Sequence, residues 1–198
     1  MQDIEKNETI VKSIRKEKRG MIVMQAFTFK SPIYKGSTKI LDVFDDIEEK
    51  TGSVQRVYRN KLQQTSDFIL GNNFIINIKA FDIGNELACE INEVLGRKTL
   101  IKSQWKGYSN NKGNFTLFDK TKISTNPRWE IQTSDGYYKI EKNLGNKQVF
   151  MSDETGMKVA EITYDKPIPS QKNTMILHTK KWNSLEVAAL YLLISTRY

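Results

Sequence analysis

The stretch SLEVAALYLLISTRY, residues 184–198, decides the fold of this chain. Within it, residues 187–194 are an unbroken apolar run that passes more than twice round a helix. A helix that is apolar on every side is buried all round, in a protein core or in a membrane. The stretch reaches only about 22 Å as a helix, whereas a bilayer core of about 30 Å needs about 20 residues. We therefore expect a buried core helix and no transmembrane span.

The beginning of this helix carries capping signals of its own. Asn183 or Ser184 can cap the first turn, and Glu186 lies where a carboxylate meets the positive end of the helix dipole. These polar residues predict one solvated mouth at the entrance to a dry interior.

Upstream of the helix the chain has the pattern of short strands separated by turns. The segment FIINIKAF, residues 74–81, alternates apolar and polar side chains, and Asp135-Gly136 between WEIQTS and YYKIEK is a hairpin signal. The strands that we predict span residues 21–29, 40–44, 53–59, 74–81, 87–91, 97–105, 114–123, 128–132, 137–141, 149–152, 157–164 and 175–179, with a polar loop over 107–113. About a dozen strands leave exposed edges unless the sheet closes, so a closed antiparallel barrel around the terminal helix is expected.

The two ends of the chain differ in character. Residues 1–20 are polar with a thin apolar stripe and predict an N-terminal helix or arm, followed by one β-domain over residues 21–198. The N-terminal segment has no apolar core of a secretory signal, and Cys89 is the only cysteine. A cytoplasmic location is expected, peripheral at the membrane if the protein binds lipid.

The residues needed for catalysis and metal binding are scarce. Cys89 and His178 are each the only residue of their type, and no nucleotide-binding glycine motif occurs. The acidic stretch at residues 42–49 lacks the calcium-loop pattern, and turn chemistry explains its carboxylates. We therefore expect no enzyme, no cofactor, no catalytic residue and no metal centre.

The positive charge of the chain is concentrated in its middle. The net charge is +8, and residues 97–147 hold 11 Lys and Arg against 4 Asp and Glu. Such a field favours phosphate-bearing partners, although a solvated outer face is the simpler explanation. The candidate anion-binding residues, placed on common strand faces by their spacing, are Lys98, Lys102, Lys106, Lys120 and Lys122. The expected partner is an anionic membrane surface or another anionic ligand.

Aromatic residues interleave with these lysines. Trp105, Tyr108 and Phe115 would offer stacking platforms for single-stranded nucleic acid if they were exposed. A core role would bury them, so the exposure of Trp105 separates the two hypotheses.

Four segments carry a resemblance to a known family: LDVFDDIEEKTGSVQR (41–56), FIINIKAFDIGNELACEI (74–91), VFMSDETGMKVAEI (149–162) and SLEVAALYLLI (184–194). Repeated units of strand, Asp turn and strand before an apolar helix resemble the tubby C-terminal-like superfamily, which includes tubby-like proteins, phospholipid scramblases and LURP-one-related proteins. The likeness is greatest to small bacterial-type relatives of the last group. It implies a closed barrel of about twelve antiparallel strands around a central hydrophobic C-terminal helix.

The resemblance also bears on function. Tubby-like proteins bind phosphoinositides through basic side chains on the barrel, but no segment here matches their signature motifs, so no binding residue is transferred. The resemblance implies a non-enzymatic binding module for anionic lipid headgroups or another anionic ligand. An interaction or scaffold protein and a single-stranded nucleic-acid binder are the competing hypotheses.

Overall fold

The computed structural model of the chain describes residues 24–32, 34–71, 74–96, 103–143, 145–165 and 171–198. These residues form twelve β-strands and two α-helices. The strands are β1 (Gln25–Lys30), β2 (Leu41–Asp45), β3 (Lys50–Val57), β4 (Asn77–Asp82), β5 (Leu87–Glu93), β6 (Gln104–Ser109), β7 (Gly113–Asp119), β8 (Arg128–Thr133), β9 (Gly136–Lys142), β10 (Gln148–Asp153), β11 (Lys158–Tyr164) and β12 (Lys172–Leu177), and the helices are α2 (Lys61–Ile69) and α3 (Ser184–Arg197).

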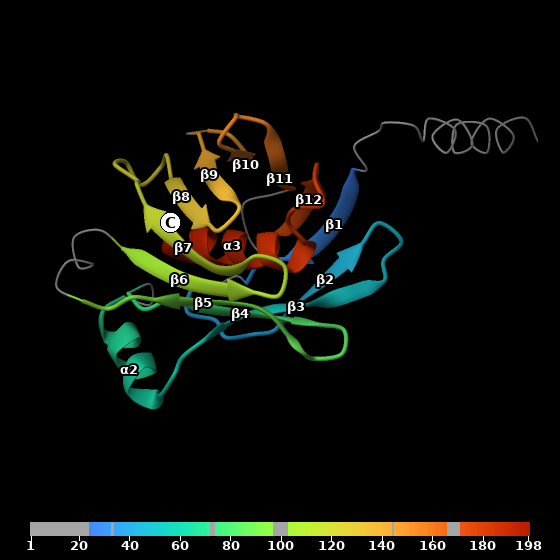
Figure 1. Ribbon diagram of the computed structural model, residues 1–198. Coiled ribbons are helices and arrows are strands. Elements are labelled where there is room, and N and C mark those ends of the chain that lie inside the picture. Colours follow the sequence, from blue (N-terminus) through green and yellow to red (C-terminus); the bar gives the residue numbers. More distant parts are fainter. Residues whose placement is uncertain (1–23, 33, 72–73, 97–102, 144, 166–170) are drawn as a thin grey trace, which may run out of the picture.

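The strands close into one antiparallel barrel. Each strand pairs with its neighbours in the sequence, and β1 pairs with β12 to complete the ring. Figure 1 shows this ring of strands with α3 running through it. Because the barrel is closed, each of the twelve described strands pairs on both sides, so none of them is an exposed edge strand. The predicted closed barrel around a central helix is confirmed.

The antiparallel order gives the barrel two distinct ends. The loops after β1, β3, β5, β7, β9 and β11 leave the barrel at one end, which we call the α2 end because α2 lies in the loop after β3. The loops after the even-numbered strands up to β10 leave at the opposite end. The C-terminal turn of α3 lies at the α2 end, where the Tyr198 hydroxyl donates a hydrogen bond of 2.5 Å to Asp119.

Helix α3 fills the barrel. Twelve of its 14 residues are buried, including the whole apolar run that predicted it. Asn183 is the N-cap: its side chain accepts from the Glu186 N–H at 2.9 Å, and Glu186 accepts from the Asn183 N–H at 2.8 Å. Ser109 of β6 donates to the same carboxylate at 2.5 Å. Glu186 is fully buried while Asn183 is half-buried, so the acidic residue that we expected at a solvated mouth lies inside the barrel instead.

Close approach of backbone to helix occurs at Gly52 on β3. A Cβ added there would lie 2.3 Å from the Phe81 carbonyl oxygen and 2.9 Å from both Cδ atoms of Leu185 on α3. Real Cβ atoms do not come so near, so only glycine lets the first turn of α3 lie against this strand.

Three hairpins at the opposite end share one turn. In each, a strand-ending aspartate accepts hydrogen bonds from backbone N–H groups further round the turn: Asp45 from Ile47 and Glu49, Asp82 from Glu86, and Asp153 from Thr155 and Met157. The third residue after each aspartate has a positive φ, namely Glu48 at 63°, Asn85 at 63° and Gly156 at 84°. The acidic stretch at residues 42–49 thus contains a hairpin turn, as predicted.

The structure corrects several predicted boundaries. The strand predicted over 97–105 begins only at Gln104 in the described residues, and residues 97–102 lie outside them. The polar loop predicted over 107–113 is wrong, because β6 continues to Ser109. The strand predicted over 114–123 ends at Asp119 as β7, and α2 was not predicted. The predicted arm over residues 1–20 lies outside the described residues.

Neither helix in the described part of the chain combines the length and the hydropathy that a membrane crossing requires.

Candidate functional site

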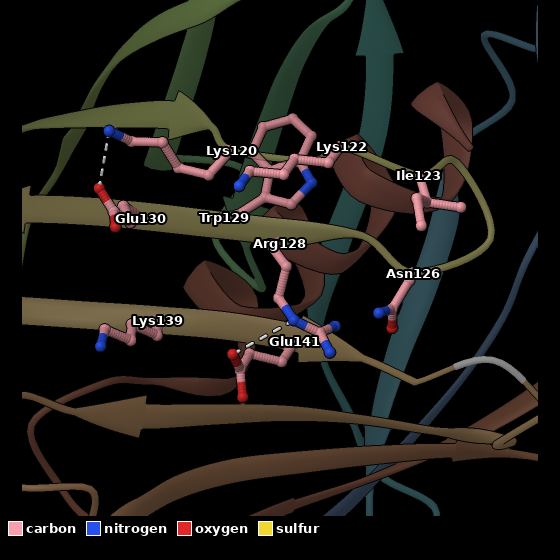
Figure 2. A pocket seen from close by; sticks show the side chains of 9 residues that line it. All are labelled: Lys120, Lys122, Ile123, Asn126, Arg128, Trp129, Glu130, Lys139 and Glu141. Atoms are coloured by element: carbon pink, nitrogen blue, oxygen red, sulfur yellow. Dashed lines mark ion pairs between the residues drawn. The ribbon is translucent and has the colours of Figure 1, made fainter.

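A basic groove is hollowed into the outer surface of the barrel at the α2 end. Its volume is about 390 Å³, and it spans the loop between β7 and β8 and the outward faces of β8 and β9. The lining residues are Lys120, Lys122, Ile123, Asn126, Arg128, Trp129, Glu130, Lys139 and Glu141. Figure 2 shows their side chains around the groove. Four cationic side chains face two carboxylates, so the groove is net positive.

The loop that carries Lys120 and Lys122 is held by local hydrogen bonds. The Lys120 N–H donates to the Arg128 carbonyl at 2.8 Å, and the Thr121 N–H donates to the Asp119 carboxylate at 2.9 Å. The Thr121 hydroxyl accepts from the Arg128 N–H at 3.0 Å. These contacts fix the two lysines beside the start of β8.

Strand alternation supplies the rest of the charge. Trp129 and Ile131 of β8 point into the barrel, which turns Arg128 and Glu130 outward. The register of β8 on β9 places Glu130 opposite Lys139 and Arg128 opposite Glu141. The Arg128 guanidinium lies 3.3 Å from the Glu141 carboxylate, and the Lys120 ammonium lies 3.1 Å from that of Glu130.

Neighbouring donors keep one of these carboxylates ionised. A hydrogen bond from the Tyr137 hydroxyl is the main cause that holds the pKa of Glu130 below its ordinary value; burial opposes it, and the contacts with Lys120 and Lys139 add to it. Burial, with the Glu130 hydrogen bond second, raises the pKa of Tyr137 to about 12. At neutral pH Glu130 is therefore a carboxylate.

Two cations in the groove lie outside close ion pairs, although Lys139 still acts on the neighbouring Glu130 carboxylate. Lys122 and Lys139 are exposed, and neither forms an ion pair with any residue that the structure describes. The buried indole Nε1 of Trp129, which lines the groove, likewise has no hydrogen-bond partner in the described structure. The groove thus offers two exposed ammonium groups outside close ion pairs, which are suited to an anion rich in acceptor oxygens.

The five predicted lysines do not all meet here. Lys120 and Lys122 line the groove, although they lie in a loop after β7 and not on the strand face that we expected. Lys106 is exposed on β6 and is not a lining residue. Lys98 and Lys102 lie outside the described residues.

Sequence reasoning missed Arg128 and Lys139. Both lie on predicted strands, and a signal for them was present. The alternation of WEIQ after Arg128 turns that residue outward, and the turn at Asp135-Gly136 fixes which residues of the two strands face each other.

The aromatic residues divide between core and surface. Trp105 is fully buried, with its indole N–H donating to the Ile76 carbonyl at 3.0 Å, and Phe115 is buried beside it in the core. Neither can stack on a nucleic-acid base, while Tyr108 is exposed. The stacking platform predicted from these residues is therefore wrong for two of its three members.

The structure places the other candidate chemical groups away from the groove. The His178 Nε2 lies 3.6 Å from a Glu161 carboxylate oxygen, and Cys89 is buried on β5. Within the described ranges, no three His, Cys, Asp or Glu residues are grouped so as to hold a metal ion.

Comparison with known proteins identifies the architecture. Residues 27–198 match the family described as "Tubby C-terminal like domain". The chain belongs to this tubby C-terminal-like family. The resemblance predicted from the strand, turn and helix pattern is confirmed at this level. No curated protein sequence matches the chain.

One solved structure is similar to this tubby-like chain. It is the X-ray structure of a protein from Arabidopsis thaliana, with 6% sequence identity and a TM-score of 0.48. The match covers 88% of the tubby-like chain and 91% of the plant protein.

Proposed function

We propose that this tubby-like domain is a non-enzymatic binding module that takes an anionic, phosphate-bearing headgroup at the groove between the β7–β8 loop and β9. The observation that carries the proposal is the pair of exposed ammonium groups outside close ion pairs, Lys122 and Lys139, on opposite sides of β8 (Figure 2). Arg128 adds positive charge to the groove, while its Nη atoms donate to the carbonyls of Pro127 and Lys142 and to the Asn143 side chain. The phosphoinositide binding of tubby-like proteins, implied by the family, supports the same class of ligand.

A headgroup on a membrane is favoured over a free anion by the openness of the site. The groove lies on the outer surface at the α2 end of the barrel, where a flat surface can approach it. Electrostatic attraction of basic residues to an anionic leaflet is worth about 1 kcal/mol for each residue near the surface. Among the other three predicted lysines, we include Lys106 in the proposal as a contact with the membrane outside the groove. Lys98 and Lys102 stay predictions.

The test is flotation with phosphatidylcholine vesicles, with and without phosphatidylserine. In the first variant Lys122→Gln and Lys139→Gln are combined. We expect it to bind anionic vesicles about thirtyfold more weakly than the parent, because two contributions of about 1 kcal/mol are removed. Binding of the parent should also fall steeply as salt rises, because exposed charges are screened over about 8 Å at physiological ionic strength.

The matched control carries Lys180→Gln and Lys181→Gln. These lysines are exposed in the loop before α3, at the opposite end of the barrel, and their substitution changes the net charge equally. Equal losses in the two variants would show attraction to net charge alone and would contradict a site at the groove. Binding of inositol phosphate in solution, together with no binding to vesicles, would mean that the ligand is a soluble anion and not a membrane headgroup.

Binding of a single-stranded oligonucleotide that survives Tyr108→Ala would not use the predicted stacking residues, since Trp105 and Phe115 are buried.

A further inference from the structure

Helix α2 presents its polar side to the protein and its apolar side to water. Its only buried residue is Asp67. Leu62, Phe68 and Ile69 are exposed by 75%, 70% and 75%, and Leu70 at the C-cap by 54%. Leu62 and Ile69 are seven residues apart and share a face, with Asp67 on the opposite side of the helix. A surface helix of a soluble domain normally has the reverse arrangement.

Buried polar contacts hold the helix in this orientation. The Asp67 carboxylate lies 2.7 Å from the guanidinium of Arg56, and both side chains are almost completely buried. Its other oxygen accepts from the N–H groups of Phe74 and Ile75, each at 2.8 Å. The Tyr58 hydroxyl donates to Asp67 at 2.7 Å. Because a buried ion pair strongly resists loss of one partner, the apolar face cannot turn inward at low cost.

Basic residues lie at the N-terminal end of this helix. Arg59 and Lys61 are exposed at the start of α2, and the Arg56 guanidinium also donates to the carbonyl of Lys35 at 2.9 Å, which holds an exposed lysine beside the helix. Among the described residues of the segment that joins β3 to β4, the only carboxylate is the paired Asp67. The helix surface is thus apolar along its exposed face and cationic at its N-terminal end.

The same polarity extends to the whole molecule. In the described loops of the α2 end, seven basic residues face two acidic ones: Lys35, Lys39, Arg59, Lys61, Lys120, Lys122 and Lys147 against Asp67 and Asp165. In those of the opposite end, three basic residues face six acidic ones: Lys112, Lys180 and Lys181 against Asp46, Glu48, Glu49, Glu86, Asp135 and Glu154. An anionic surface would therefore attract the α2 end and repel the other.

We propose that α2 is a membrane-contacting helix whose Leu62, Phe68, Ile69 and Leu70 side chains enter the headgroup region of an anionic bilayer. Charge selects this occupant, because the basic loops of the α2 end repel the same end of a second copy and complement an anionic leaflet. The inference rests on the proposed function in one respect, since the charge attraction brings the helix to the surface. The apolar contact is a separate step that increases the lifetime of the bound state.

Site-specific fluorescence tests the insertion. An environment-sensitive dye is attached at Ile69→Cys on α2, and at Ile83→Cys in the β4–β5 hairpin of the opposite end as the control. The two parent side chains are equally exposed, at 75% and 76%. Cys89 can stay, because it is buried and burial raises the pKa of its thiol, which suppresses its reaction with the dye. Vesicles of phosphatidylcholine and phosphatidylserine should shift the emission of the first label to the blue and leave the second unchanged.

Each other outcome overturns the proposal in a distinguishable way. If the protein floats with anionic vesicles while the label at residue 69 stays in water, the insertion is wrong and the headgroup site stands. If that label becomes shielded without vesicles as protein concentration rises, a second copy covers α2. If the protein does not float with anionic vesicles at low salt, the insertion and the proposed headgroup function both fail.

A pair of double variants separates apolar contact from charge. Leu62→Ser with Ile69→Ser should weaken binding to anionic vesicles about tenfold, because two exposed apolar side chains no longer leave water on binding. Ile83→Ser with Met157→Ser, which removes exposed apolar side chains at the opposite end, should leave binding unchanged. The difference in vesicle binding between the Leu62→Ser, Ile69→Ser variant and the parent should persist at high salt, where the charges of the groove contribute little. Equal binding of both variants and the parent would contradict a role for the α2 face.

Discussion

At the residue scale, one backbone conformation recurs in three hairpins but is occupied by three different residues. Glu48, Asn85 and Gly156 follow the turn aspartates at the same spacing and all have a left-handed φ. A residue with a Cβ pays about 1–2 kcal/mol in this region, whereas glycine does not. The shared turn therefore allows a comparison in which the side chain is the variable.

The prediction is that substitutions at these positions have opposite signs. Glu48→Gly should raise the free energy of unfolding by about 0.5–1 kcal/mol, and Gly156→Ala should lower it by about 1 kcal/mol. Nothing lies within 4 Å of a Cβ built on Gly156, so a steric clash does not contribute. Urea unfolding measures both. Changes of the same sign would mean that contacts of the side chains, and not φ, decide the stability of the turns.

A second residue-scale prediction concerns Glu93. This buried carboxylate accepts the Ile76 N–H at 2.7 Å, and burial raises its pKa from 4.5 to about 7, although the Ile76 hydrogen bond opposes the shift. The folded state thus binds the proton more tightly than the unfolded state. Its contribution to stability is complete below about pH 4.5 and is lost as pH rises towards 7.

Glu93→Gln removes this titration and keeps an oxygen that can accept the same hydrogen bond. The difference in free energy of unfolding between variant and parent should grow in favour of the variant from pH 4.5 to 7. Urea unfolding over this range measures it, and the other titrating groups cancel in the difference. If the difference in free energy of unfolding does not change with pH over this range, the raised pKa of Glu93 is wrong.

At the scale of elements, the two helices differ in what holds them. Leu190 on α3 is buried to 99%, whereas Leu62 on α2 is exposed by 75%. Leu190→Ala should lower the free energy of unfolding by about 2–5 kcal/mol, and Leu62→Ala by less than about 0.5 kcal/mol. The two variants delete the same atoms, so each is the control of the other in a urea titration. Similar losses would contradict the central position of α3.

The same difference explains which elements the sequence predicts. Helix α3 can be predicted from the sequence because the eight consecutive apolar residues that signal it are the same residues that pack against the barrel. Helix α2 has no apolar stripe towards the core, and its anchoring carboxylate pairs with an arginine eleven positions earlier. Such a tertiary ion pair leaves no periodic signal in the local sequence.

The error in β6 has a local cause. Gly107 predicts a loop by residue type, but in the barrel the Phe115 ring of the neighbouring strand occupies the space of its missing side chain. A Cβ there would lie 2.2 Å from that ring. The glycine is therefore a packing residue inside a strand, and the sequence alone does not distinguish it from a turn residue.

At the scale of the whole molecule, the barrel topology separates charged residues between its two ends, which the net charge of a sequence segment does not show. Consecutive loops leave at opposite ends, so the basic segment over residues 97–147 mixes both: Lys122 lies at the α2 end, and Lys112 with its partner Asp135 at the other. The groove is likewise assembled from two strands and a loop. The sequence identified a basic region, but the closed topology decides which of its charges act together.

The position of α3 after all twelve strands has a consequence for synthesis. The core-filling helix leaves the ribosome after every strand that must surround it, and β1 waits for β12 before the ring can close. During translation, successive hairpins form with their inward side chains uncovered, a state that favours aggregation and recruits chaperones. Pairing the first strand with the last also demands the longest loop closure in the chain, which slows folding. Because α3 follows every strand, the barrel stays without its core until α3 has been made.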